Sequence, residues 1–599
     1  MSSAALELRP AILRLPAVTS AVTVGVLTLL YLLRQWALPK PLPGIPFNEA
    51  AAKIVLGDAA EIRQIKASGG RARVWFGQQT VKHNSPIAQA FLTPFGKPAV
   101  ILSDYREAQD ILLRRGKEFD RASRNVEAFQ GVVPWHHIAM TTSDPQFKKN
   151  RELVKDLMTH QFLNTVSAPE IYRNTIKFVE LWKTKARIAS GRPFQADDDV
   201  HIMAFDIIKV VALGDGDSAS MTDAYAQLVR DSKLEAAGSS PADRDMPFVF
   251  PTNKSNADLA AHTTMQDAVG KAITQPFPRL FNYINGRTSK MRQAHADKQR
   301  MLGEQVELAL QRLRGTDGDA DVRSALDHML RREMAAAAKA GREPVYDSPS
   351  MYDELYGYIG AGHDTTSTTL QWALKFLAKH PEAQTKLRTA LRAAYPDAAA
   401  EKRYPTVTEL TARMGNHQVP YLDAVIEETL RLNGPIPTLV REATCDTIVL
   451  GHAIPKGTMV FFDIAGPSLL KPSIAVNESV RSDSSRRHRQ DHPDMRATWD
   501  DMDPSEFRPE RWLTTPQPCH SGGAEAAGFD AQAGPILTFS TGVRGCFGRR
   551  LAYLELRVVV SLLLWDLELL SLPEELNDWS VVESMTIKPK KCFVRLAEV

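Results

Sequence analysis

The chain is poor in cysteine. Its 599 residues include only four, which are Cys445, Cys519, Cys546 and Cys592. None of them forms the C-x-x-C spacing of a zinc site, and four are too few for the disulfide framework of a small secreted protein. The scarcity of cysteine therefore excludes a disulfide-bonded scaffold and suits a reducing compartment.

An excess of charge is also missing. The 73 basic and 70 acidic side chains leave a formal net charge of +3, which argues against a nucleic-acid-binding protein, because such proteins concentrate basic residues on one surface. Hydrophobic residues at 44% and charged residues at 24% are ordinary for a soluble globular protein. No internal repeat is evident, so a repeat architecture is not expected.

Long hydrophobic runs are absent except for one near the N-terminus. Residues 17–33 carry no charge and lie between Arg14 and Arg34, and their number is at the short end of what crosses a bilayer as a helix. A cleaved signal peptide is the alternative, but this run is long for one, and Arg34-Gln35-Trp36 stands where a small-residue cleavage site should be. We expect an uncleaved anchor, whose orientation the flanking charges do not determine.

The stretch Phe539–Gly548 surrounds Cys546 with three glycines and one arginine, directly before the apolar run 551–564. Glycine allows close approaches that a side chain would block. A helix N-terminus and the cation of Arg544 favour the charged form of a thiol. This pattern indicates a thiolate presented to a large ligand; the alternative is a small buried cysteine in a glycine-rich turn.

A second informative stretch is the helix predicted over 350–380. Ser350 and Asp353 have the spacing of a capping box, and Pro381 ends the run. Its middle contains two glycines and several Ser/Thr residues around Asp364 and Thr365, each costing up to about 1 kcal/mol relative to alanine in a helix. A function that offsets this cost is one reading, and a polar kink in a packed helix is the other.

Three further patterns carry candidate charges. Glu428 and Arg431 are neighbours on a helix predicted over 421–432, and Arg511 lies in the downstream segment Phe507–Trp512. Phe147 and Arg151 share one face of a helix predicted from Asp144 to about Phe162. Arg441 lies on a segment with strand character.

These motifs together resemble the cytochrome P-450 monooxygenases of the membrane-anchored, microsomal type, particularly fungal members of secondary metabolism. F-x-x-G-x-R-x-C-x-G matches their haem-thiolate loop, A-G-x-D-T their oxygen-binding helix, and E-x-x-R with P-E-R-W their conserved charge network. The resemblance runs from about Pro39 to the C-terminus and implies a mainly α fold with small β-sheets, preceded by one transmembrane helix.

The resemblance also assigns roles. It makes Cys546 the axial ligand of haem iron, Asp364 and Thr365 the pair that delivers protons to bound dioxygen, and Glu428, Arg431 and Arg511 a structural network. The expected contacts to haem b are Arg151, Arg441, Phe539, Arg544, Cys546 and Gly548. In this family a tryptophan usually stands four residues before Arg151. Phe147 keeps the aromatic packing here but cannot donate an indole N–H bond.

The implied function is insertion of one oxygen atom of O2 into a lipophilic small molecule, by hydroxylation or epoxidation. No flavin or nicotinamide module remains unassigned, so electrons are expected from NADPH through a separate flavoprotein reductase. The implied location is the endoplasmic reticulum membrane, with a cytosolic catalytic domain. Two alternatives stay open: a haem-thiolate isomerase or dehydratase that needs no external electrons, which the intact Asp364-Thr365 pair disfavours, and a haem-binding sensor.

The expected domain organisation follows. It comprises an N-terminal segment 1–16, an anchor 17–33, a proline-rich linker 34–46 and a catalytic domain 47–599. Within that domain, the polar run 471–500 departs from the family pattern and reads as a disordered or partner-facing insertion, and residues 517–534 form a second insertion. A loop of turn formers at 238–241 and 247–256 corresponds to the mobile lid over the substrate. The substrate pocket is expected along Phe129–Trp135, Tyr358–Ala361, Ile436–Leu439 and Ser584–Thr586.

Overall fold

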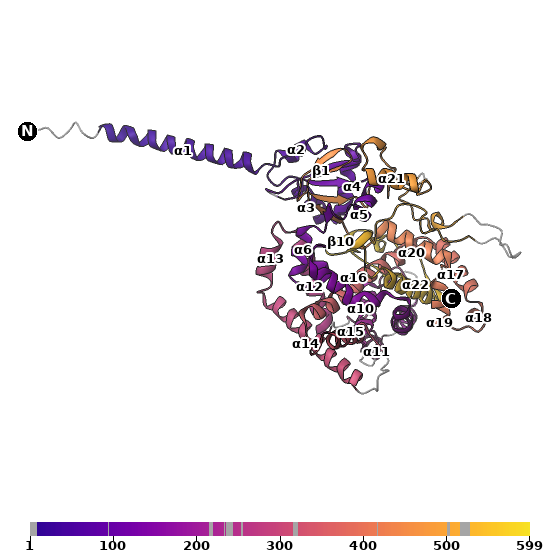
Figure 1. Cartoon of the computed structure of the whole chain (residues 1–599). Coiled ribbons are helices and arrows are strands. Elements are labelled where there is room, and N and C mark those ends of the chain that lie inside the picture. The colour runs from indigo at the N-terminus through magenta and orange to yellow at the C-terminus, as the bar shows by residue number, and fades with distance from the viewer. Residues whose placement is uncertain are drawn as a thin grey trace, which may run out of the picture.

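The structure is a computed structural model, and it describes residues 9–93, 95–214, 220–232, 234, 244–252, 256–314, 322–415, 417–499, 503–514 and 527–599. Helices dominate these residues (Figure 1). The α-helices are α1 Arg9–Ala37, α2 Glu49–Ala52, α3 Ala59–Ala67, α4 Ala72–Lys82, α5 Tyr105–Leu113, α6 Ser123–Gln130, α7 Pro145–Val154, α8 His160–Phe162, α9 Ala168–Ala189, α10 Asp197–Leu213, α11 Met221–Asp231, α12 Ala257–Thr274, α13 Pro278–Asn285, α14 Ser289–Arg314, α15 Ala325–Ala340, α16 Pro349–Lys379, α17 Pro381–Ala394, α18 Pro396–Ala400, α19 Val407–Met414, α20 Pro420–Asn433, α21 Asp483–Asp491 and α22 Arg549–Asp566.

The strands are short and form small sheets. They are β1 Ile87–Ala90, β2 Ala99–Leu102, β3 Phe119–Asp120, β4 Phe194–Gln195, β5 Leu439–Ala443, β6 Thr447–Val449, β7 His452–Ile454, β8 Met459–Phe462, β9 Leu567–Leu569, β10 Val581–Glu583, β11 Ile587–Pro589, β12 Phe593–Val594 and β13 Leu596–Glu598. The largest sheet has the order β1-β2-β8-β5-β3, in which only the β2–β8 pair is parallel. The other described sheets are two-stranded.

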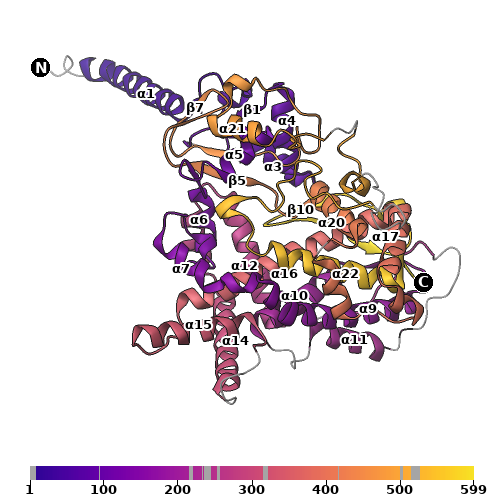
Figure 2. The same ribbon diagram turned by 45° about the vertical axis from the view of Figure 1, so that its right-hand side comes forward.

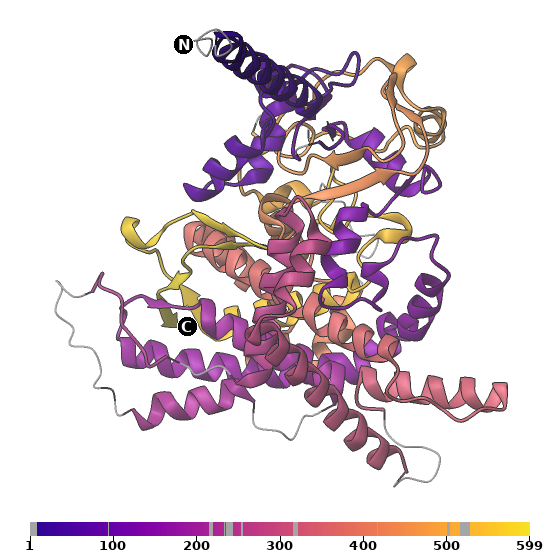
Figure 3. The ribbon, with the colours of Figure 1, turned by 90° about the vertical axis from the view of Figure 1, so that its left-hand side faces the viewer.

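The sheet and the helices occupy different parts of the molecule. The five-stranded sheet lies at one end together with α3, α4, α5 and α21, and the long helices fill the other end (Figures 2 and 3). α16 crosses the middle of the helical part and packs against α10, α20 and α22. α10 is mostly buried because most of its sequence is apolar, and three aspartates in its first turn favour the start of a helix. The fold is therefore mainly α with small β-sheets, as the sequence predicts.

One helix is long and apolar enough to cross a membrane. α1 has 29 residues and projects from the rest of the chain (Figure 1), and its apolar window is Ser20–Ala37. The predicted anchor 17–33 lies inside it, but the helix continues to Ala37, so the proline-rich linker begins later than the predicted residue 34. A signal sequence or the core helix of a soluble protein passes the same test of length and composition.

Two predicted helices have different ends in the structure. α16 begins at Pro349, and the side chain of Ser348, not Ser350, caps it by accepting from the Met351 N–H. Asp353 instead pairs with Lys298 at 2.5 Å in a buried position. The helix predicted to run to about Phe162 ends at Val154 and continues as a 3-10 turn, Lys155–Met158. Thr159 then caps the next helix by accepting from the Phe162 N–H.

The expectation of disorder for the 471–500 insertion is wrong over the part that the structure describes. Residues 471–499 contain a 3-10 turn at Glu478–Val480 and the helix α21, and they pack against α5. Of the second insertion, 517–526 lie outside the described residues, and Phe529 forms a bridge with Leu513. The 238–241 part of the predicted lid also lies outside the described residues.

Candidate functional site

A cavity of about 200 Å³ lies between the middle of α16 and the start of α22. From α16 it is lined by Ala361, Gly362, Thr365 and Thr366, and from the opposite side by Cys546, Phe547 and Gly548. The structure thus brings the two most informative stretches of the sequence to one cavity. Its full lining is Arg121, His136, His137, Ile138, Phe147, Arg151, Val154, Glu354, Gly357, Tyr358, Ala361, Gly362, Thr365, Thr366, Phe539, Val543, Arg544, Gly545, Cys546, Phe547, Gly548, Leu551, Ala552 and Glu555.

The loop that carries Cys546 is a tight backbone turn. The Cys546 N–H donates to the Phe539 carbonyl at 2.9 Å, which closes the loop. Gly542 has a φ of +72°, and a Cβ there would lie 2.2 Å from the Leu112 carbonyl oxygen of α5. A side chain at this position is excluded both by conformation and by space. The loop therefore rests directly on the end of α5.

The Cys546 thiol is exposed to the cavity and enclosed by protein elsewhere. Burial raises the pKa of this thiol, and the Gly548 N–H and the cations of Arg549 and Arg151 oppose the rise without overcoming it. The sequence predicts a favoured thiolate, with Arg544 as the nearby cation. Arg544 instead donates to the Met140 carbonyl at 2.8 Å and lies over the Phe147 ring. A metal ion that binds here must displace the thiol proton, because the thiolate is the ligand.

Cations gather at one end of the cavity. Arg121, Arg151 and Arg544 line it, and Arg441 is buried nearby, donating to Ser540 Oγ at 3.2 Å. Burial and the cation of Arg544 lower the pKa of Arg441 to about 10. Burial and the cations of Arg544 and Arg441 lower that of Arg121 well below its ordinary value.

Several donors of these guanidinium groups are buried without a hydrogen-bond partner. They are Nε of Arg121, and Nε and Nη1 of Arg544. Because buried cations and donors are costly without partners, this end of the cavity fits a ligand that carries carboxylates. The two haem propionates are such carboxylates. Arg121 was missed at the sequence level because it follows a two-residue strand, where no periodicity marks it.

Phe147 and Arg151 do share one face of α7. The Arg151 guanidinium lies 4.9 Å from the centroid of the Phe547 ring, and the Arg544 guanidinium lies 4.5 Å from that of Phe147. Phe547 directly follows Cys546. Both α7 residues therefore contact the cysteine loop through side chains that line the cavity.

The polar segment of α16 has two differently placed side chains. Thr365 lines the cavity, and its Oγ1 donates to the Ala361 carbonyl at 2.6 Å. Asp364 is buried behind it, outside the lining, and its carboxylate accepts from Thr586 Oγ1 at 2.6 Å. Thr586 follows β10, and the sequence placed it only among the pocket-lining residues. Gly362 has a packing reason as well, since a Cβ there would lie 2.6 Å from Ile208 of α10.

The cavity also holds polar residues that the sequence did not reveal. His137 Nδ1 lies 2.8 Å from a Glu354 oxygen, and His136 Nε2 lies 3.5 Å from the same carboxylate. Burial lowers the pKa of each histidine to about 3, so both imidazoles are neutral near pH 7. On α22, burial raises the pKa of Glu555 to about 8, which keeps it protonated at neutral pH. His137 and Glu354 are 217 residues apart, so no local pattern could indicate their contact.

Glu428, Arg431 and Arg511 meet away from the cavity. The fully buried Glu428 carboxylate accepts from both Nε and Nη2 of Arg431 at 2.8 Å and from Arg511 Nε at 2.9 Å. The Arg508 N–H at 2.9 Å and Trp512 Nε1 at 3.0 Å also donate to it. The structure thus brings together the three charges that the sequence singled out, and it ties α20 to the segment 508–512.

Comparisons with known proteins agree with this arrangement. The family model described as Cytochrome P-450 matches residues 81–466 and 496–594. Cytochrome P-450 monooxygenase TRI13 of Fusarium sporotrichioides is 37% identical over 582 residues, covering 95% of this chain and 97% of that protein. Cytochrome P-450 monooxygenase xilC of Penicillium crustosum is 34% identical, covering 95% of this chain and 94% of that protein.

The fold also matches a solved structure. The crystal structure of a cytochrome P-450, CYP102L1, aligns with 94% of this chain and 100% of its own length, with a TM-score of 0.62 and 16% sequence identity. This likeness concerns the fold alone, whereas the family match and the fungal relatives concern the sequence along most of its length. The chain belongs to the cytochrome P-450 family, whose members use haem and O2, and it is a cytochrome P-450 monooxygenase.

Proposed function

We propose that the cavity binds haem b with Cys546 as the axial ligand, and that the protein inserts one oxygen atom of O2 into a lipophilic small molecule by hydroxylation or epoxidation. The single observation that carries this proposal is the placement of Cys546 and Thr365 on opposite sides of one cavity. Haem with a thiolate ligand supplies the redox chemistry that activates O2. The remaining steps depend on residues of this chain.

The cations at the end of the cavity hold the haem propionates in this proposal. Arg544 and Arg121 have unpaired donors there, and Arg151 lines the same space. Forked guanidinium donors suit carboxylates. Arg441 supports the cluster from behind, and Phe539 and Gly548 complete the wall around the thiolate.

Proton delivery falls to the polar segment of α16. Thr365 lines the cavity, and its hydroxyl donates to the Ala361 carbonyl at 2.6 Å. It would have to leave this bond to pass a proton toward dioxygen in the cavity. The Asp364 carboxylate is held behind it by Thr586 Oγ1. We infer that Asp364 exchanges this bond for one to Thr365 or water during turnover, which makes Thr586 the residue that positions it. An isomerase or dehydratase needs no such delivery.

Electrons come from NADPH through a separate flavoprotein reductase in this proposal. A flavin or nicotinamide domain is not assigned to any part of the chain, and the family match accounts for most of it. Near α16 the cavity wall is largely apolar, with Ile138, Tyr358 and Ala361. A lipophilic small molecule is the substrate class that suits such a wall.

Replacing Thr365 with alanine tests the monooxygenase function. We expect the variant to keep haem but to divert electrons to peroxide, because the hydroxyl that passes protons is gone. Product formed per NADPH should fall about a hundredfold, the lower end of the loss expected for a positioned proton donor. The measurement is NADPH consumption, peroxide and product, with a reductase, under labelled O2.

The matched control is Thr369→Ala, one turn along α16, where the hydroxyl donates only to the Thr365 carbonyl. Its coupling should equal that of the unaltered protein. Full coupling in the Thr365 variant would remove the assigned role. Turnover without NADPH would favour the isomerase or dehydratase, and binding of haem without any turnover would favour the sensor.

We further propose that α1 anchors the protein in the endoplasmic reticulum membrane, with residues 47–599 as the cytosolic catalytic domain. The length and composition of Ser20–Ala37 support this placement. Deleting residues 1–37 should move most of the protein from the membrane fraction to the soluble fraction, because the apolar span is removed. The fractions are compared by sedimentation of expressing cells, and persistence of the truncated protein in the membrane fraction would contradict α1 as the sole anchor.

A further inference from the structure

Most of the 471–499 segment lies outside the family match, because the family model leaves out residues 467–495. It is nevertheless a built part of this molecule. Its helix α21 packs against α5, at the sheet end of the molecule (Figure 2). It contacts two different structures that matter for the proposed site, through the buried Arg481 and the half-buried Trp499.

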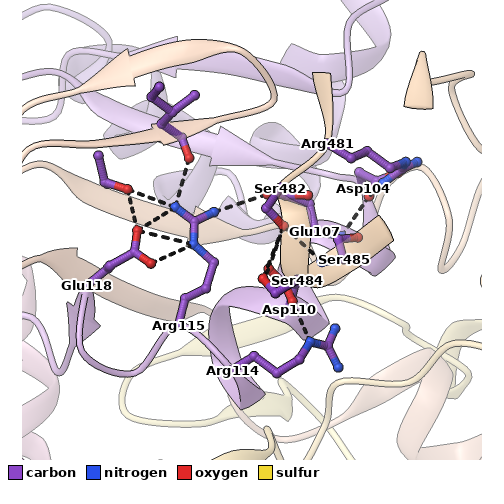
Figure 4. A network of polar contacts seen from close by, with 12 residues as sticks. Asp104, Glu107, Asp110, Arg114, Arg115, Glu118, Arg481, Ser482, Ser484 and Ser485 are labelled. Atoms are coloured by element: carbon purple, nitrogen blue, oxygen red, sulfur yellow. Dashed lines mark hydrogen bonds and ion pairs between the residues drawn. The ribbon is translucent and has the colours of Figure 1, made fainter. Parts of the chain in front are cut away.

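The first contact is an ion pair with the start of α5. Arg481 makes two hydrogen bonds to Asp104, at 2.6 and 2.8 Å, and both side chains are about nine-tenths buried or more (Figure 4). Asp104 is also the residue that caps α5, because its carboxylate accepts from the Glu107 N–H at 2.8 Å. A two-point contact between a guanidinium and a carboxylate fixes orientation as well as distance. Arg481 therefore sets where α5 begins.

Further bonds extend along the same face of α5. Ser482 Oγ and Ser484 Oγ both donate to Asp110, at 2.6 and 2.7 Å, and Asp110 also pairs with Arg114 (Figure 4). Arg106 makes two bonds to Glu478 at 2.5 and 3.1 Å. The segment is thus bonded to α5 from its first to its last turn.

The last turn of α5 supports the cysteine loop. A Cβ atom on Gly542 would lie only 2.2 Å from the Leu112 carbonyl oxygen. Gly542 begins the 3-10 turn Gly542–Arg544, which leads to Cys546. A shift of α5 toward the loop has no free space to occupy, so the positions of α5 and the loop are linked.

The other end of the segment contacts the Glu428 network. The Trp499 ring lies 5.2 Å from the Arg431 guanidinium and 5.3 Å from that of Arg511. It also packs edge-on against Trp512 at 5.0 Å. A Cβ at Gly534 would lie 2.6 Å from the Trp499 ring. The segment therefore spans from α5 to the buried charge network.

We propose that the 471–499 segment is a brace that fixes α5 against the cysteine loop, and that Arg481 is its main positioning residue. The inference rests on the proposed function only in that Cys546 is the haem ligand. Through the two-point bond to Asp104, Arg481 holds α5, and α5 holds the loop at Gly542. The brace thereby keeps the sulfur at the cavity wall.

Arg481→Ala tests the brace in the full-length protein. Hydrogen exchange of amides in 539–548 should become about tenfold faster. Loss of a hydrogen bond to a charged group removes a stabilising free energy that corresponds to a change of about tenfold in an equilibrium constant. In the haem-loaded protein, the ferrous carbon-monoxide spectrum should convert faster from the thiolate form to the thiol form, again about tenfold. The matched control is Arg487→Ala, since Arg487 lies exposed on α21 and bonds only to the Asp483 backbone.

One further variant guards against misfolding. Arg481→Lys keeps the charge but loses the two-point contact of the guanidinium with Asp104. We expect its hydrogen-exchange rate in 539–548 to lie between those of Arg487→Ala and Arg481→Ala. Exchange in 539–548 equal to that of Arg487→Ala, in either Arg481 variant, would overturn the brace. Absence of a thiolate spectrum in the unaltered protein would overturn the proposed function instead, and the exchange measurement would still decide the brace because it needs no haem.

Discussion

Glu428→Ala is expected to destabilise the folded protein strongly. The Glu428 carboxylate is fully buried and is the acceptor for two buried guanidinium groups, those of Arg431 and Arg511. Alanine would remove the carboxylate that lies between these two cations. Removing one partner of a buried ion pair costs about 3–5 kcal/mol, which is a large part of the roughly 5–15 kcal/mol by which proteins are stable. The free energy of unfolding, measured by urea titration, should fall by that amount.

The control for this variant is Glu510→Ala. Glu510 lies in the same segment as Arg511, but its carboxylate is 40% exposed, pairs with the exposed Lys386 at 2.5 Å and accepts one bond from the Tyr421 hydroxyl of α20 at 2.9 Å. Surface pairs of this kind contribute about 0–1 kcal/mol. If both variants lose the same stability, then the Glu428 network is not what ties α20 to the segment 508–512.

Local sequence predicted α16 well and its first residue less well. Ser348 and Ser350 both suit a cap, but Pro349 stands between them. Proline is favoured at the first position of a helix, because its missing N–H is not needed there, and this favours Ser348. The capping-box spacing of Ser350 and Asp353 was misleading, since Asp353 is used to pair with Lys298 of α14.

For α7 the sequence predicted the start of the helix but not its end. The apolar positions through Phe162 fit a continuous helix, yet the chain changes at Val154 to a 3-10 turn. Thr159 then starts a new helix as its cap. Threonine inside a predicted helix was the available signal for this break, because its hydroxyl competes for backbone N–H groups.

The site divides in the same way. Cys546, Thr365 and Glu428 lie in compact motifs, so their sequence neighbours identified them. Arg121 reaches the site only through the tertiary fold, and nothing near it in the sequence marks it. Thr586 was expected only as a pocket-lining residue, and its bond to Asp364 comes from the tertiary fold. The polar run 471–500 was predicted to be a disordered or partner-facing insertion, and disorder is wrong for the described residues 471–499. Its charges are instead matched by buried partners on α5, such as Asp104, which composition alone does not reveal.

Cys546→Ser is expected to abolish both the thiolate spectrum of the ferrous carbon-monoxide adduct and the formation of product. Serine has nearly the same shape but offers a hydroxyl whose proton is far harder to remove, so the electron-rich thiolate ligand is lost. Stability should change by only about 0.5 kcal/mol, because Cys546 faces the cavity rather than the packed core. Spectra, product and the free energy of unfolding of the purified protein are to be measured together.

Cys445→Ser is the matched control, because Cys445 is an exposed thiol and does not line the cavity. It should keep the full thiolate spectrum and full turnover. A more demanding control is Cys592→Ser, since Cys592 is completely buried and burial raises its pKa to about 12. That variant should lose stability, because a hydroxyl replaces a less polar thiol at a fully buried position, but the protein that stays folded should show the thiolate spectrum. A thiolate spectrum in Cys546→Ser, lost only on replacing another cysteine, would place the iron ligand elsewhere in the chain.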